Sequence, residues 1–133
     1  MRYLANSAFA AILVIAAPAV AVAQDAPQFM QDTFPQAAVE GAWQEFQAIN
    51  DPDGALDAQT KELIALAVAA QVPCDYCVYY HTKAAEAHGA NDAQIREALA
   101  SAASVRKWST VLNGAQYDRD AWQQQVDAIF AAE

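Results

Sequence analysis

The feature that most constrains the fold is the absence of strand-like alternation in this 133-residue chain. Nowhere do apolar and polar residues alternate for long enough to form a half-buried β-strand. Apolar residues instead recur at three- and four-residue spacing between residues that cap or break helices. The chain has no internal repeat, low-complexity run or long linker. We therefore expect an all-α fold, a single-domain bundle of about five helices.

The first 23 residues have the pattern of an export signal. Arg2 is their only charged residue, and an apolar stretch from Ala8 ends in the small-x-small tripeptide Ala-Val-Ala before Gln24. The stretch is shorter than the roughly 20 apolar residues of a membrane span and runs directly into polar residues. We expect cleavage near Ala23, a periplasmic or secreted product, and no membrane attachment after the signal is removed.

The remaining residues, 24–133, suffice for one compact domain. Without Arg2 they carry six basic and sixteen acidic residues, a net charge of −10. Such a surface repels nucleic acid and anionic lipid, which both bind basic patches. We therefore expect neither as a partner.

Capping residues and apolar periodicity locate the helices after an irregular segment that extends to Phe34. The run from Leu63 to Ala70 is apolar on every side, which predicts a helix buried all round. The second and third helices should pack as an antiparallel pair. The five predicted helices cover 35–50, from Asp57 to just before Pro73, from about Cys74 to His88, from Asn91 to about Asn113, and from about Asp118 onward.

Three residues at the start of the third helix carry the candidate chemistry. Cys74, Cys77 and His81 are separated by three and four positions, so a helix places them on one face. Unpaired N–H groups in a first turn favour a thiolate, and an imidazole one turn on can take the thiol proton. We predict that Cys77 is the nucleophile and that Cys74 resolves its oxidised form by closing a disulfide.

An imidazole that acts as a base works better when a carboxylate holds its second nitrogen. Glu62 is the candidate, since it shares a helix stripe with small and apolar residues. The alternative is that Glu62 is an exposed acid in a first turn, where the helix dipole also favours it.

Two other roles for the cysteines stay open. A structural disulfide across four residues would restrain the unfolded chain by only roughly 2 kcal/mol, against roughly 3 for a 15-residue loop. A metal site would recruit His81 and either Glu62 or His88, although structural zinc sites usually use two separated ligand pairs. We therefore favour the redox role and expect no metal and no cofactor.

Four aromatic side chains are expected to be packing residues rather than catalytic ones. These are Tyr76, Tyr79, Tyr80 and Trp108. Tyr76, which lies between the cysteines, could also donate a hydrogen bond into the site.

The spacing of Glu62, Cys74, Cys77 and His81 resembles that of the carboxymuconolactone decarboxylase and alkylhydroperoxidase D superfamily, in its C-x-x-C branch. The likeness covers about residues 56–114. It implies an all-helical fold in which two helices carry the site, usually assembled as trimers or as hexamers built from dimers.

The resemblance also implies a mechanism. The residue matching Cys77 attacks a peroxide, the one matching Cys74 resolves it, and those matching Glu62 and His81 relay the proton. The best-known alkylhydroperoxidase D proteins have histidine where this chain has Tyr76, and they use lipoyl or thioredoxin-like reductants in the cytoplasm. An exported protein would need a different electron source.

The sequence thus predicts an exported thiol-dependent peroxidase that reduces hydrogen peroxide or organic hydroperoxides through the Cys74–Cys77 pair. Its expected partners are the peroxide, a thiol reductant of unknown identity and further copies of the chain. The alternatives are a thiol-disulfide exchange protein and a non-catalytic oligomeric protein with a permanent disulfide.

Overall fold

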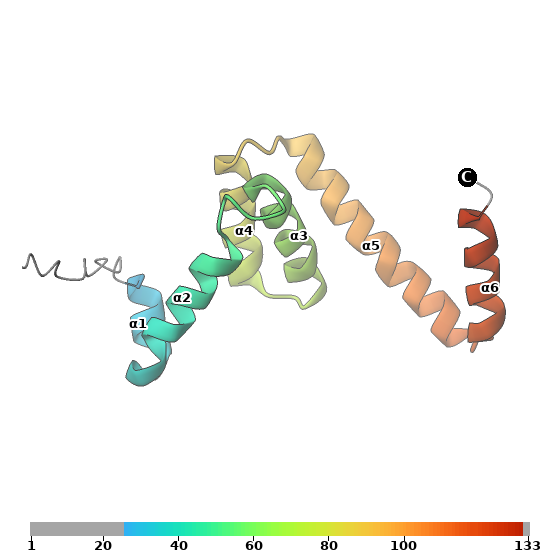
Figure 1. Cartoon of the computed structure of the whole chain (residues 1–133), viewed down its shortest axis with the longest axis horizontal. Coiled ribbons are helices and arrows are strands. Elements are labelled where there is room, and N and C mark those ends of the chain that lie inside the picture. The colour runs from blue at the N-terminus through green and yellow to red at the C-terminus, as the bar shows by residue number, and fades with distance from the viewer. Residues whose placement is uncertain (1–25, 132–133) are drawn as a thin grey trace, which may run out of the picture. The chain divides into compact units, whose positions relative to one another are not determined.

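The computed structural model describes residues 26–131, so the predicted signal at 1–23 lies outside the described residues. Within that range the chain is helical and contains no strand, which confirms the all-α class (Figure 1). The chain divides into two compact units between Glu40 and Gly41, and the second contains every candidate site residue.

Six α-helices and one short 3₁₀-helix make up the described residues. They are α1 (Gln28–Thr33), the 3₁₀-helix (Gln36–Ala38), α2 (Val39–Ile49), α3 (Ala58–Gln71), α4 (Asp75–Ala87), α5 (Asp92–Gly114) and α6 (Arg119–Phe130). The expectation of an irregular segment up to Phe34 was wrong, because α1 lies within it. A six-residue helix is too short to show an apolar period.

Helix α3 begins where its capping residue predicts. The Asp57 carboxylate accepts hydrogen bonds from the Thr60 backbone N–H at 2.9 Å and from the Thr60 hydroxyl at 2.8 Å. These bonds hold the pKa of Asp57 below its ordinary value. The helix ends at Gln71, two residues before Pro73.

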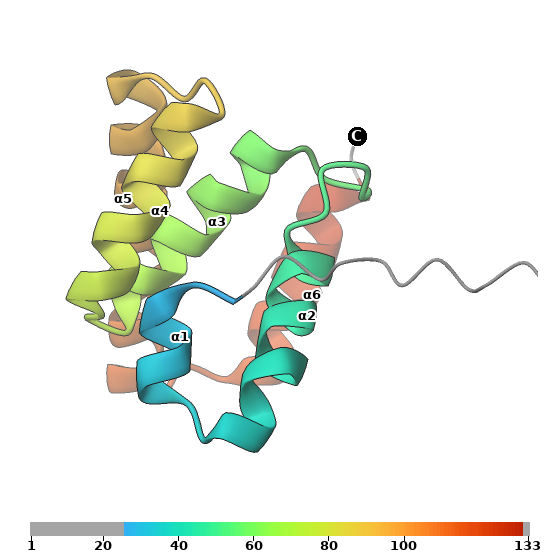
Figure 2. The same ribbon diagram turned by 90° about the vertical axis from the view of Figure 1, so that its left-hand side faces the viewer.

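Helix α3 packs against both α4 and α5, and this packing forms the core of the second unit (Figure 2). Leu66 is completely buried and Ala69 is 2% exposed, whereas Ile64 and Val68 remain about half exposed. The prediction that this helix is buried all round was therefore wrong. Two neighbouring helices cover only two sides of α3, and its third side faces outward.

The turn between α4 and α5 follows the predicted capping pattern. Gly89 adopts φ +91°, a conformation that glycine reaches without strain. The Asn91 side chain accepts from the Gln94 N–H at 3.0 Å, and the Gln94 side chain accepts from the Asn91 N–H at 2.9 Å. This capping box fixes the first turn of α5.

Hydrogen bonds from one glutamine connect α3 to the middle of α5. The Gln71 amide donates to the Ala102 carbonyl at 2.7 Å, and Arg106 donates to both the side-chain and backbone oxygens of Gln71.

Asp118 is the N-cap of α6, and its carboxylate accepts a hydrogen bond from the Ala121 backbone N–H. The described residues include no helix with the length and apolarity that a membrane crossing requires.

Leu66→Ala should lower the free energy of unfolding by about 2–5 kcal/mol, because it opens a cavity at the completely buried centre of α3. Ile64→Ala on the same helix should cost less than about 1 kcal/mol. Urea denaturation of the oxidised protein at one fixed protein concentration measures both. Equal losses for the two variants would contradict this description of the core.

Candidate functional site

The cysteine pair lies at the start of α4, as predicted. Cys74 is the N-cap of this helix, and its sulfur accepts a hydrogen bond from the Cys77 backbone N–H at 3.2 Å. The two sulfurs are joined in a disulfide, with their Cα atoms 5.2 Å apart. The pair thus occupies the helix end at which unpaired N–H groups concentrate.

A short contact between two helices defines the rest of the site. Nδ1 of His81 on α4 lies 2.6 Å from Oε2 of Glu62 on α3. Glu62 is only 5% exposed, and the His81 side chain is 20% exposed. The alternative of an exposed surface acid is therefore wrong for Glu62.

The contact determines which imidazole nitrogen is available. A buried carboxylate is costly unless it is paired, and His81 supplies the partner of Glu62. Because an ionised carboxylate only accepts hydrogen bonds, the contact assigns the proton to Nδ1. In the neutral imidazole the other nitrogen, Nε2, is then the acceptor, and Cys77 lies one helical turn before His81 on the same face of α4.

Three of the four aromatic residues that were expected to pack are largely exposed within this chain. Tyr76 is 90% exposed, Tyr79 is 70% exposed and Trp108 is 56% exposed. Helix α4 packs one side against α3, so a tyrosine between the cysteines faces outward. Tyr76 therefore does not have the packing role that was expected of it.

Tyr80 is the aromatic residue that reaches the site. Its ring meets the His81 ring edge-on, with centroids 5.1 Å apart, and meets Phe46 of α2 at 5.9 Å. Trp43 stacks on Phe46. The helical spacing of Trp43 and Phe46 is visible in the sequence, but their connection to the site is not, because it crosses between helices.

The ligand set with His88 is not assembled. His88 is the exposed C-cap of α4, seven residues after His81, which is about 10 Å further along a helix axis. In residues 26–131, no three His, Cys, Asp or Glu side chains gather in a way that could hold a metal ion.

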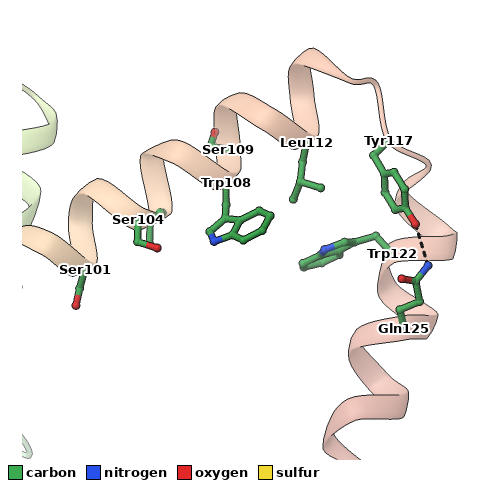
Figure 3. A pocket seen from close by; sticks show the side chains of 9 residues that line it. Ser101, Ser104, Trp108, Ser109, Leu112, Tyr117, Trp122 and Gln125 are labelled. Atoms are coloured by element: carbon green, nitrogen blue, oxygen red, sulfur yellow. Dashed lines mark hydrogen bonds between the residues drawn. The ribbon is translucent and has the colours of Figure 1, made fainter.

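A separate hollow lies between α5 and α6, and its lining does not include Glu62, His81 or either cysteine. Its volume is about 830 Å³, and three serines line it together with apolar side chains. Trp108 of α5 and Trp122 of α6 point toward one another across it, and Tyr117 accepts a hydrogen bond from Gln125 at its edge (Figure 3).

Two curated proteins are similar in sequence to about half of this chain. The chain is 41% identical over 70 residues to an uncharacterised protein of the cox locus of Paracoccus denitrificans, covering 53% of this chain and 63% of that one. It is 45% identical over 65 residues to an uncharacterised protein of Cupriavidus necator, covering 49% and 58%. The chain thus spans about three fifths of the length of these relatives.

One solved structure is similar to this chain in both sequence and fold. The alkylhydroperoxidase AhpD core from Rhodospirillum rubrum matches with a TM-score of 0.60 and 32% identity, over 65% of each chain. The fold is therefore AhpD-like, and its bonded cysteine pair is compatible with a redox function.

The model of the carboxymuconolactone decarboxylase family matches residues 33–120, about two thirds of the chain. That range includes α2 to α5 and therefore Glu62, Cys74, Cys77 and His81. The chain belongs to the carboxymuconolactone decarboxylase family.

Proposed function

We propose that this protein is an exported thiol-dependent peroxidase that reduces hydrogen peroxide or small organic hydroperoxides. The observation that carries the proposal is the contact between Glu62 and His81, one helical turn from a cysteine pair at a helix start. A structural disulfide needs no buried carboxylate–imidazole pair beside it. A thiol that must be deprotonated can use such a pair as its base.

The first step oxidises Cys77. In the reduced protein, Nε2 of His81 takes the Cys77 proton, and Glu62 stabilises the resulting imidazolium. The thiolate attacks the terminal peroxide oxygen, so an S–O bond forms while the O–O bond breaks. The leaving alkoxide or hydroxide takes the proton from His81, which leaves Cys77 as a sulfenic acid and releases an alcohol or water.

The second step closes the disulfide. The Cys74 thiol gives up its proton, its thiolate attacks the Cys77 sulfur, and the S–O bond breaks as the S–S bond forms. The departing hydroxide takes up that proton and leaves as water. The Cys77 N–H that points at the Cys74 sulfur stabilises that thiolate before attack. The peroxide has then accepted two electrons from the cysteine pair, and a dithiol or two thiols must return them by disulfide exchange.

The reductant is proposed to act outside the cytoplasm, because residues 1–23 have the pattern of a cleavable signal. In such a compartment the donor is a thiol protein or a small thiol. Tyr76 and Tyr79 provide an exposed aromatic surface beside the disulfide that a protein donor could contact.

The mature chain is also proposed to self-associate as a trimer or hexamer. Neither α5 nor α6 contains a buried residue, although both carry large apolar side chains. Val105, Trp108 and Phe130 are each more than half exposed. Exposed apolar side chains of this number are typical of subunit interfaces, and a second copy of the chain can cover them.

Thiol-disulfide exchange with another protein is the second candidate function, and the exposed Tyr76 favours it. It would use the same cysteines with a macromolecular substrate. Stopped-flow oxidation separates the two functions. A peroxidase must lose thiol in a second-order reaction with hydroperoxide that is faster than that of an unactivated cysteine.

Cys77→Ser should abolish peroxide turnover, because it removes the nucleophile. Cys74→Ser should permit one oxidation and then stop at the sulfenic acid, which a dimedone adduct at Cys77 reveals by mass spectrometry. The turnover of hydrogen peroxide and of a bulky hydroperoxide is measured side by side for each variant and for the wild type. Equal turnover by the wild type and Cys77→Ser would rule out this assignment.

His81→Ala should slow thiol oxidation by peroxide about 10²- to 10⁴-fold, the usual loss when a general base is removed. Glu62→Gln keeps the shape of the side chain and an acceptor for Nδ1 but removes the charge, so it should cause a smaller loss. In both variants alkylation of the reduced protein should require a higher pH.

Glu86→Gln is the matched control, since Glu86 is an acid on α4 that pairs with the exposed Lys83. Its alkylation profile should match that of the wild type. If the profiles of His81→Ala and Glu62→Gln also match the wild type, neither residue takes part in deprotonation.

Substitution of both Trp108 and Trp122 by Glu should reduce the assembly to single chains, because it places charge on both walls of the α5–α6 hollow. Lys83→Glu, a charge change at an exposed position of α4, should leave the mass unchanged. Sedimentation equilibrium gives the molar mass. A wild-type protein that is already a single chain would refute self-association.

A further inference from the structure

One side of the His81 imidazole is held by an aromatic residue to which the proposed mechanism gives no role. Adjacent residues on a helix point about 100° apart, so Tyr80 and His81 do not share a face of α4. Their rings nevertheless meet at 5.1 Å between centroids and at 89° between planes. The Tyr80 ring must therefore lean across the helix surface toward the imidazole.

Helix α2 keeps the Tyr80 ring in this position. Phe46 meets it edge-on at 5.9 Å and 72°, from the side of α2, and Trp43 stacks on Phe46 at 5.5 Å and 13°. Phe46 and Trp43 are half-buried, and Tyr80 is 42% exposed against 70% for Tyr79 one position before it. The three rings form a continuous row that ends at the imidazole.

The position of Phe46 is in turn fixed at the end of α2. The Asn50 amide donates to the Phe46 carbonyl at 2.8 Å, which holds the last turn of the helix. The Lys61 ammonium of α3 donates to the Asp51 carbonyl at 2.6 Å, one residue later. The chain is thus connected to α3 just beyond Phe46, on the helix that carries Glu62.

We infer that Tyr80 is a positioning residue for His81, and that Phe46 of α2 holds Tyr80 in place. The inference rests on the proposed function in giving His81 the role of the base. A single hydrogen bond at Nδ1 leaves the imidazole free to pivot about that bond. A perpendicular ring in contact with it blocks the pivot and keeps Nε2 directed toward the Cys77 side of the helix.

The surroundings of the phenol agree with this placement. Burial raises the pKa of Tyr80, and the charge of Glu62 raises it further. The Tyr80 hydroxyl therefore stays protonated while His81 exchanges a proton with Cys77. Glu62 on α3 is the carboxylate that contacts the imidazole, and α2 presents to Tyr80 the uncharged ring of Phe46.

The ring and the hydroxyl of Tyr80 make separable contributions. If the ring positions His81, Tyr80→Phe should retain the wild-type rate of Cys77 oxidation within about twofold. Tyr80→Leu should lower it about tenfold, less than the roughly 10²-fold that a misplacement near 1 Å can cost. Alkylation of the reduced Tyr80→Leu protein should also move to higher pH, and Tyr80→Phe should restore the wild-type profile.

The imidazole itself supplies a readout that does not depend on turnover. The chain has two histidines, so ¹⁵N NMR of the oxidised protein shows two imidazoles, and His88→Asn assigns them. At a pH where both are neutral, His81 should be in the Nδ1–H form in the wild type, in Tyr80→Phe and in the control Tyr79→Leu. Tyr80→Leu and, to a smaller extent, Phe46→Leu should show a mixture of the two tautomers.

The outcomes separate the two proposals. If Tyr80→Leu and Phe46→Leu keep the NMR signature and the alkylation profile of Tyr79→Leu, the positioning role is wrong even when the wild type is a good peroxidase. If the wild type does not consume peroxide but the tautomer changes as described, the peroxidase proposal fails and the positioning stands. Circular dichroism checks the helical content of each variant, and Phe46→Leu decides the question if Tyr80→Leu does not fold.

Discussion

The pairing of Glu62 with His81 is the interaction on which the rest of this structure depends. A carboxylate with 5% exposure cannot be accommodated between helices unless a donor meets it, and here the donor is a histidine on the neighbouring helix at 2.6 Å. The pair therefore requires α3 and α4 to adopt one register against each other. That register, set by the packing of Leu66 and Ala69 as well, also determines where the cysteines lie.

The start of α4 combines two properties that a reactive thiol pair needs. Cys74 caps the helix and accepts the Cys77 N–H, so one sulfur lies in the field of the helix end. Cys77 lies one turn before an imidazole whose Nδ1 is already occupied by Glu62. The helix thus offers backbone donors to one cysteine and a base to the other, which agrees with the different roles proposed for them.

The second unit buries little of its apolar surface within one chain. Its core is confined to α3 and the sides of α4 and α5 that cover it, while the far half of α5 and all of α6 leave tryptophan, valine and phenylalanine side chains exposed. A small single-core domain is marginally stable, and additional burial between copies would add to it. The proposed self-association would thus raise the stability of the folded chain as well as determine its assembly.

Local patterns in the sequence were sufficient for the helices from α2 onward and for part of the site, but not for α1. Asp57, Asn91 and Gly89 act within a few residues of their own positions, so capping rules located α3 and α5 correctly. The shared face of the cysteines and His81 likewise follows from spacing on one helix. The sequence also predicted Glu62 as the partner of His81, with an exposed acid in a first turn as the alternative.

The tertiary structure decided what crosses between helices. It placed Glu62 against His81, left Ile64 and Val68 uncovered on a helix that looked buried all round, and turned Tyr76 outward. It also brought Phe46 of α2 to the ring beside the imidazole. Helical periodicity defines faces but not which neighbour covers each face, because that choice depends on packing between segments distant in the chain.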